Sequence, residues 1–142
     1  MIPLDIDLPW PPSVNHYWRK VGNRVLISRE GREYRRIVVG QLAPRRMTQQ
    51  PTTKRIAMTI HAHATDLRRR DLDNITKSLF DAFQHAGVYE DDEQIDDYRV
   101  VRGEKIKGGV VRISMAECVA WPRADERPMT HAFRRQKDDY GG

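Results

Sequence analysis

The feature that most constrains this chain is a change of hydrophobic period between residues 54 and 87. Over 54–65, apolar side chains alternate with more polar ones, which is the pattern of a β-strand with one buried face. Over 75–86, apolar side chains recur at helical spacing, and the pattern ends at Gly87, a residue typical of helix ends. A strand followed by an amphipathic helix predicts an α+β fold in which helices cover a sheet.

The N-terminal part of the chain predicts an edge strand, a hairpin and a second helix. Residues 2–8 alternate apolar and polar side chains, and they include prolines, which are typical of an edge strand. Residues 17–28 fit a hairpin that turns at Gly22-Asn23. Ser28 is predicted to cap a helix that continues until Pro44.

Two further strands are predicted towards the end of the chain, over 97–102 and 111–115. Gly108 and Gly109 lie between them, so we expect the two strands to pair as a hairpin. With these strands, the expected fold is a mixed sheet of about four to five strands with two main helices.

The length of 142 residues suits a single domain. All predicted elements fall within 1–117, so we expect that range to form the domain. Residues 118–142 show no sustained period, contain two prolines and end in Gly-Gly, which predicts a flexible tail. Cys118 is the only cysteine, which excludes an internal disulfide and a thiolate zinc site and favours a reducing cytoplasm.

No segment of the sequence has the length and apolarity of a membrane span. The longest run without Asp, Glu, Lys or Arg is the eleven residues 8–18, which include three prolines. A spanning helix needs about 20 apolar residues. Asp5 and Asp7 stand where a secretory signal would carry basic residues, so we expect a cytoplasmic protein without a membrane partner.

Arginine supplies most of the positive charge. The net charge is +5, and 19 of the 25 basic residues are arginine, whose planar guanidinium binds phosphate oxygens two at a time. Negative charge is concentrated in 90–97, where six residues are acidic. A basic surface with one acidic pocket attracts a phosphate chain and leaves a place for metal ions. A charged block taken alone, however, is most often a solvated face.

A group of charged residues opens the predicted second helix. The three arginines 68–70 precede Asp71 and Asp73, and Lys77 follows one turn later on the face opposite the apolar stripe. Two carboxylates so close repel each other, and either the helix N-terminus or a bound divalent cation relieves the repulsion. Hard ions such as Mg²⁺ take one or two carboxylates and complete their shell with water and phosphate. The structural alternative is that Asp71, with Asn74, simply caps the helix.

A second acidic pair, Asp91 and Asp92, follows this helix. A helix over 73–86 is about 20 Å long, and residues 87–92 reach about 20 Å when extended. Asp92 therefore meets Asp71 and Asp73 only if the chain doubles straight back along the helix, or if a second subunit supplies it. We favour the first arrangement here, and the second stays open.

Several short motifs follow one another in a characteristic order. They are LPWPPSVN at 8–15, RRDLDN at 69–74 with Lys77, FDA at 80–82, AGV at 86–88, DD at 91–92 with Gln94, and DYRVV at 97–101. Together they resemble the RusA family of crossover junction endodeoxyribonucleases. The similarity covers about 2–117, the whole predicted domain, and several motifs in order are more specific than any one of them.

The resemblance implies a homodimeric, Mg²⁺-dependent nuclease, with Mn²⁺ as a substitute ion and no organic cofactor. Such an enzyme binds four-way (Holliday) DNA junctions and resolves them by paired nicks during recombination and repair, and phages and prophages often encode it. The resemblance implies that Asp71, Asp73 and Asp92 bind the metal and that Lys77 is a further catalytic residue. The residues implied to approach DNA are Ser13, Val14, Asn15, His16, Arg68, Arg69 and Arg70.

Two other functions are consistent with the charge pattern. A non-catalytic, basic nucleic-acid-binding module would use the arginines for salt-dependent affinity, with Asp71 and Asp73 as helix caps. An interaction protein would dock a basic partner on 90–97. Cleavage of a labelled four-way junction separates these functions from a nuclease.

Histidines and aromatic residues give weaker signals. His61 and His63 share one side of a predicted strand, but no third His or Cys lies at a metal-site spacing, so a structural role is favoured. Trp10, Tyr17 and Trp18 could stack on unpaired bases. Because they flank a proline-rich turn, a place in the core or in a dimer contact is favoured for them.

Overall fold

The computed structural model describes residues 2–45 and 50–119. Its main sheet has four strands in the order β1 (Leu4–Pro9), β6 (Val110–Glu117), β4 (Ile56–His63) and β5 (Ile95–Arg102). A separate two-stranded sheet pairs β2 (Trp18–Val21) with β3 (Arg24–Ile27). The helices are α1 (Val14–Tyr17), α2 (Arg29–Leu42) and α3 (Asp73–His85), with short 3-10 turns η1 (Ala43–Arg45) and η2 (Asp92–Gln94).

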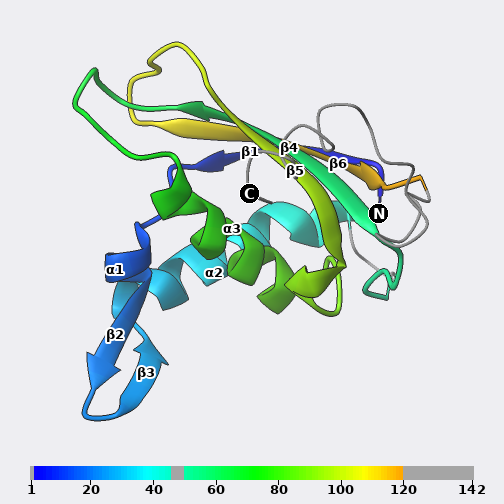
Figure 1. Ribbon diagram of the computed structural model, residues 1–142, viewed down its shortest axis with the longest axis horizontal. Helices are drawn as coiled ribbons and strands as arrows, with labels where there is room; N and C mark the ends of the chain where they lie inside the picture. The colour runs from blue at the N-terminus through cyan, green and yellow to red at the C-terminus, as the bar shows by residue number, and fades with distance from the viewer. Residues whose placement is uncertain (1, 46–49, 120–142) are drawn as a thin grey trace, which may run out of the picture.

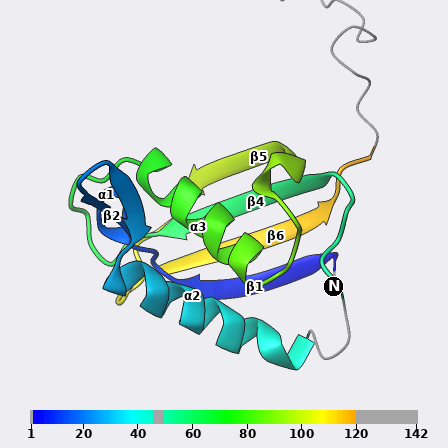
Figure 2. The same cartoon turned by 90° about the horizontal axis from the view of Figure 1, so that it is seen from below.

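Helices α2 and α3 cover one face of the main sheet, and the β2–β3 hairpin extends beyond it (Figures 1 and 2). Strands β4 and β5 run parallel, whereas β6 is antiparallel to both of its neighbours, β1 and β4. The predicted α+β fold with a mixed sheet and two main helices is confirmed.

The change of hydrophobic period between residues 54 and 87 corresponds to β4 and α3. Residues on one side of β4 are buried beneath the helices, and Ile75, Leu79 and Phe83 of α3 are buried against them. Asp73 and Lys77 are exposed on the other side of the helix, as predicted. Because α3 connects two parallel strands, it runs antiparallel to them, and its first turn lies beside the C-terminal ends of β4 and β5.

One prediction about the sheet is wrong, because β5 and β6 do not pair with each other. Strand β4 lies between them and pairs with both. Two strand spacings amount to about 10 Å, which residues 103–109 cross easily. The glycine-rich signal at Gly108 and Gly109 correctly marks a turn, with φ of 89° and 74°, but a turn signal does not specify the partner of the strand that follows.

The start of α2 is fixed by Ser28, which caps the helix as predicted. Its hydroxyl accepts a hydrogen bond from the N–H of Gly31 and donates one to the carbonyl of Tyr17, both at 2.9 Å. Gly31 packs so closely on the preceding segment that a Cβ atom there would collide with the Tyr17 carbonyl. The helix therefore holds α1 and the hairpin in a fixed position.

Strand β6 ends at Glu117, and the N–H of Cys118 still donates a hydrogen bond to the carbonyl of Arg55 at 2.8 Å. The flexible tail predicted for 118–142 lies beyond the described residues from position 120 onwards. Within the described ranges, no helix is long and apolar enough to cross a membrane.

Candidate active site

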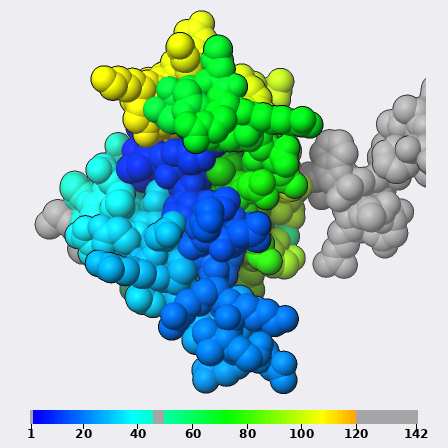
Figure 3. All heavy atoms as spheres, turned by 90° about the vertical axis from the view of Figure 1, so that its left-hand side faces the viewer, coloured from blue at the N-terminus to red at the C-terminus, as the bar shows by residue number. Residues whose placement is uncertain are grey.

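A cavity of about 660 Å³ opens at the end of the sheet where β1 and β4 end. Two segments that are far apart in sequence line it, and Figure 3 shows them side by side, the first in blue and the second in green. The lining residues are Trp10, Pro11, Pro12, Ser13, His16, Arg69, Arg70, Asp71, Asn74 and Ile75. The fold thus brings the proline-rich opening motif next to the arginine and aspartate motif.

The carboxylates of Asp71 and Asp73 are exposed at the first turn of α3. The cap position belongs to Leu72, and among residues 2–45 and 50–119 no side chain forms a hydrogen bond that caps this helix. The N–H of Asn74 donates to the backbone carbonyl of Asp71, not to its carboxylate. Within the described residues neither carboxylate takes part in a hydrogen bond or ion pair, so the alternative of a capping role for Asp71 is not realised.

The three arginines before Asp71 differ in how the fold uses them. Arg70 donates to the carboxylate of Asp66 at 2.7 Å, and its side chain is only 24% exposed. Arg68 lies 3.6 Å from the same carboxylate and is 81% exposed, while Arg69 is exposed beside the cavity. Hydrogen bonds from Arg70 and from the N–H of Arg68 lower the pKa of Asp66 to about 2. Arg68 and Arg69 therefore offer the most accessible guanidinium groups.

The opening motif forms the first turn of α1. The carbonyl of Ser13 accepts hydrogen bonds from the N–H groups of His16 and Tyr17 at 2.9 and 2.8 Å. This turn directs Ser13 and His16 towards the cavity, whereas Val14 and Asn15 do not line it. Of the four residues predicted here to approach DNA, two therefore lie beside Asp71.

Lys77 lies further along α3, and Asp92 of η2 lies beside the same helix. Helical spacing places Asp73, Lys77 and Asp81 on one face. The backbone N–H of Asp92 donates to the side-chain carbonyl of Gln84 at 3.1 Å, so Asp92 lies beside the C-terminal half of α3. The chain does double back along the helix after Gly87, and it brings the carboxyl group of Asp92 into the electrostatic range of Asp81 and Lys77.

Asp91 and Asp92 have different surroundings. The carboxylate of Asp91 accepts from the N–H of Glu93, and Gln94 completes a capping box by accepting from the N–H of Asp91. Partial burial and the carboxyl groups of Asp91 and Asp81 raise the pKa of Asp92 above its ordinary value, while Lys77 opposes the rise. The fold thus uses Asp91 structurally and keeps Asp92 beside Lys77.

The three predicted metal ligands are spread along α3. Asp73 and Asp81 are about 12 Å apart along the helix axis, and Asp92 lies near Asp81 and Gln84. No three Asp, Glu, His or Cys side chains of the described part of the chain are close enough to hold a metal ion. A single chain presents Asp71 and Asp73 with the arginines, and it presents Asp92 with Lys77.

Sequence reasoning missed the side chains that tie α1 to α3. The hydroxyl of Tyr17, which is fully buried, donates to the carboxylate of Asp81 at 2.5 Å. Arg35 of α2 donates to the same carboxylate at 2.8 Å. Burial and the contact with Asp81 raise the pKa of Tyr17. The spacing of Asp81 four residues after Lys77 is the signal that could have identified it.

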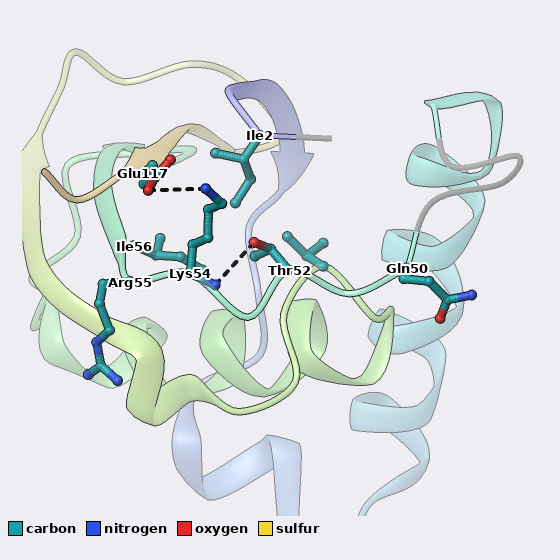
Figure 4. A pocket seen from close by; sticks show the side chains of 8 residues that line it. Ile2, Gln50, Thr52, Lys54, Arg55, Ile56 and Glu117 are labelled. Atoms are coloured by element: carbon teal, nitrogen blue, oxygen red, sulfur yellow. Dashed lines mark hydrogen bonds and ion pairs between the residues drawn. The ribbon is translucent and has the colours of Figure 1, made fainter.

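Two other regions do not contribute to this site. His63 contacts the carbonyl of Glu104 at 2.7 Å, and His61 is exposed on the sheet face away from the helices, which agrees with a structural role. A second cavity of about 480 Å³ lies at the opposite end of the sheet, where an ion pair joins Lys54 to Glu117 (Figure 4). None of the predicted site residues lines it.

Comparison with known proteins decides which family these motifs represent. The sequence profile described as Endodeoxyribonuclease RusA matches residues 9–116, which include every predicted site residue. The chain belongs to the RusA family. The matched RusA range contains both lining segments of the cavity and Asp92.

Several relatives in the RusA family share most of the chain. The crossover junction endodeoxyribonuclease rusA of Enterobacteria phage HK97 is 48% identical over 111 residues, which is 78% of this chain and 91% of the relative. The RusA proteins of Shigella sonnei (strain Ss046) and of Enterobacteria phage 82 are 42% and 41% identical, and each comparison covers 79% of this chain and 92% of the relative. The similarity thus spans nearly the whole length of these relatives.

Proposed function

We propose that this protein is a metal-dependent endonuclease that binds four-way DNA junctions and resolves them by paired hydrolysis of phosphodiester bonds. The observation that carries the proposal is the cavity lined by Arg69, Arg70 and Asp71, where the Asp71 carboxylate forms no hydrogen bond or ion pair with the described residues. The names of the RusA relatives, crossover junction endodeoxyribonucleases, support the choice of a junction as substrate.

The donor set fits Mg²⁺, for which Mn²⁺ is a substitute. Asp71 and Asp73 offer exposed carboxylate oxygens that no described residue neutralises, and hard divalent ions prefer such ligands. Asp71, Asp73 and Asp92 would hold the ion. When bound, it supplies a Lewis acid for the developing negative charge and an activated water for hydrolysis.

The remaining side chains act on the DNA backbone. Arg68 and Arg69 are accessible for phosphate oxygens, and Arg70 is held by Asp66 at the rim of the cavity. Lys77 carries its positive charge on the same helix and stabilises the charge that develops on the phosphate during cleavage. Ser13 and His16 offer hydrogen bonds from the opposite side of the cavity.

We further propose that the protein acts as a homodimer. Two identical sites related by a two-fold axis match the two equivalent strands of a four-way junction. Because Asp92 lies beside the C-terminal half of α3 and the described part of one chain holds no group of three metal ligands, a partner chain is the simplest source of the third carboxylate. The within-chain site that we favoured from the sequence is the alternative to this arrangement.

The test is cleavage of a four-way junction whose strands are labelled one at a time, with and without Mg²⁺. A resolvase produces nicks at symmetric positions in two opposing strands, only with the metal. Binding without product would support the non-catalytic nucleic-acid-binding module. Linear duplex of the same sequence serves as the control substrate.

A further inference from the structure

The ammonium group of Lys77 lies over the indole ring of Trp18. The distance from the Lys77 nitrogen to the ring centroid is 5.5 Å, within the range of a cation–π contact. Lys77 is exposed on the second turn of α3, and its four-carbon side chain would otherwise sample many rotamers. The indole face therefore restricts where the positive charge is held.

Trp18 can restrict the position of Lys77 because contacts with the core and with neighbouring residues fix Trp18 itself. It ends α1 and begins β2, it is partly buried against the core, and it pairs with Ile27 across the hairpin. Its ring lies 4.4 Å from the ring of Tyr17, centroid to centroid, at an angle of 57°. Trp18 thus packs against Tyr17, the one fully buried residue of α1.

Tyr17 in turn is attached to the helix that carries Lys77. Its hydroxyl donates to Asp81, one helical turn after Lys77, at 2.5 Å. Arg35 donates to Asp81 through Nε and Nη2 at 2.9 and 2.8 Å, and through Nε to the Tyr17 hydroxyl at 3.1 Å. This network of Tyr17, Arg35 and Asp81 ties the end of α1 to α2 and α3, and Trp18 follows Tyr17 directly, so the indole and Lys77 keep their relative position.

We propose that Trp18 is a positioning residue for Lys77, which it holds over its indole face in the orientation used for cleavage. The proposal rests on the proposed nuclease function. The competing role for an indole next to a DNA site is stacking on an unpaired base, which would contribute to affinity rather than to rate. Rate and affinity therefore separate the two roles.

The test compares Trp18→Leu with Trp18→Phe in single-turnover cleavage of a four-way junction, with the dissociation constant of the junction measured separately. We expect Trp18→Leu to lower the rate about fivefold and to leave the dissociation constant within about twofold, because the lost contact orients a charge and binds no DNA. Trp18→Phe keeps an aromatic face and should recover most of the rate. Val25→Ala, at an exposed position of the same hairpin, is the control and should change neither quantity.

A double-mutant cycle shows whether the effect passes through Lys77. In the Lys77→Ala background, Trp18→Leu should cause no further loss of rate. Equal losses in both backgrounds, or a loss of affinity with an unchanged rate, would overturn the proposal. Absence of cleavage by the unaltered protein would instead overturn the proposed function.

A measurement without DNA covers the case in which Trp18→Leu does not fold. The ring current of the indole should shift the side-chain methylene protons of Lys77 upfield from those of the other lysines in the NMR spectrum. Trp18→Phe should reduce this shift, and Lys77 shifts like those of an exposed lysine in the unaltered protein would contradict the proposal. This readout does not depend on nuclease activity.

Discussion

Neighbouring aspartates in this chain have different environments, although the sequence makes them look alike. Asp91 accepts hydrogen bonds within a capping box, whereas Asp92 is partly buried beside other carboxyl groups. Asp71 and Asp73 are exposed, and no helix cap uses them. Asp71 and Asp73, whose charges no described residue neutralises, are therefore the carboxylates that a bound cation would stabilise most.

The first prediction concerns Asp73→Asn, which we expect to reduce junction cleavage by at least about a thousandfold, since a lost metal-binding carboxylate removes the charge stabilisation that cleavage requires. Junction binding should survive or tighten, because a negative charge next to phosphate is removed. Single-turnover cleavage and a binding titration measure the two effects.

The matched control for this substitution is Asp7→Asn, on the face of edge strand β1 that points away from the buried core, where Asp7 forms an exposed ion pair with Arg112. It should leave both cleavage and binding unchanged. Parallel loss of binding and cleavage in Asp73→Asn would contradict the assigned role.

The second prediction concerns Asp92→Asn and stability. The folded pKa of Asp92 is raised, so its ionised form destabilises the fold, and this cost is complete above the raised pKa and absent below the ordinary value of 3.8. The substitution should therefore raise the melting temperature at neutral pH and have no effect at the lowest pH. Melting curves across this range measure the difference, and a lower melting temperature at neutral pH would disprove it.

At the residue scale, the sequence identified the charged side chains of the site better than the buried hydrogen bonds that hold the surrounding helices in place. The sequence predicts Asp71, Arg69 and Ser13 as site residues, and the fold brings them to one cavity. The buried hydrogen bond from Tyr17 to Asp81 joins residues 64 positions apart, and no local pattern encodes such a pair.

Among the elements, α3 organises the site. Its buried stripe attaches it to the sheet, and its exposed face carries Asp73 and Lys77 in successive turns. Helix α2 holds the other side of the cavity indirectly, because Ser28 and Gly31 anchor α1. We therefore expect substitutions at the contact between α1 and α2 to destabilise the fold.

The third prediction tests this contact with Gly31→Ala. A Cβ atom at this position collides with the Tyr17 carbonyl and lies 2.9 Å from the side chain of Ile27, so we expect a loss of about 1–3 kcal/mol in the free energy of unfolding. Gly40→Ala, in the same helix with open space around the new Cβ atom, should instead stabilise by about 0.5–1 kcal/mol. Urea unfolding measures both, and equal effects of the two substitutions would refute the close packing at Gly31.

Most elements could be predicted because their signals are local. Alternation defines β1 and β4, spacing defines α3, and Ser28 marks the start of α2. Strand pairing was not predictable in the same way, because the insertion of β4 between β5 and β6 depends on contacts between distant segments.

On the scale of the whole molecule, the separation of the carboxylates has a consequence for assembly. Asp71 and Asp73 lie at the first turn of α3 and Asp92 beside its C-terminal half, and the described part of one chain contains no group of three metal ligands. The sequence could limit the reach of the chain after the helix, but it could not say where the chain would stop.

The fourth prediction follows from a shared site. Asp73→Asn and Asp92→Asn chains should each be inactive alone, and a mixture that forms heterodimers should regain one intact site. Random mixing then yields about a quarter of the nicking of the unaltered protein, without paired nicks. A strand-labelled junction measures this recovery, and an inactive mixture with confirmed heterodimers would show that each chain completes its own site.

The most direct test of the central claim, that two such sites cut a junction together, uses a supercoiled plasmid that extrudes a cruciform. Paired nicks within one complex linearise the plasmid, whereas a single nick releases the supercoiling, and the cruciform is reabsorbed to leave a nicked circle. With Mg²⁺ we expect linear plasmid from the unaltered protein and intact supercoiled plasmid from Asp73→Asn. Nicked circles alone, or no cleavage of a plasmid that the protein binds, would contradict the account.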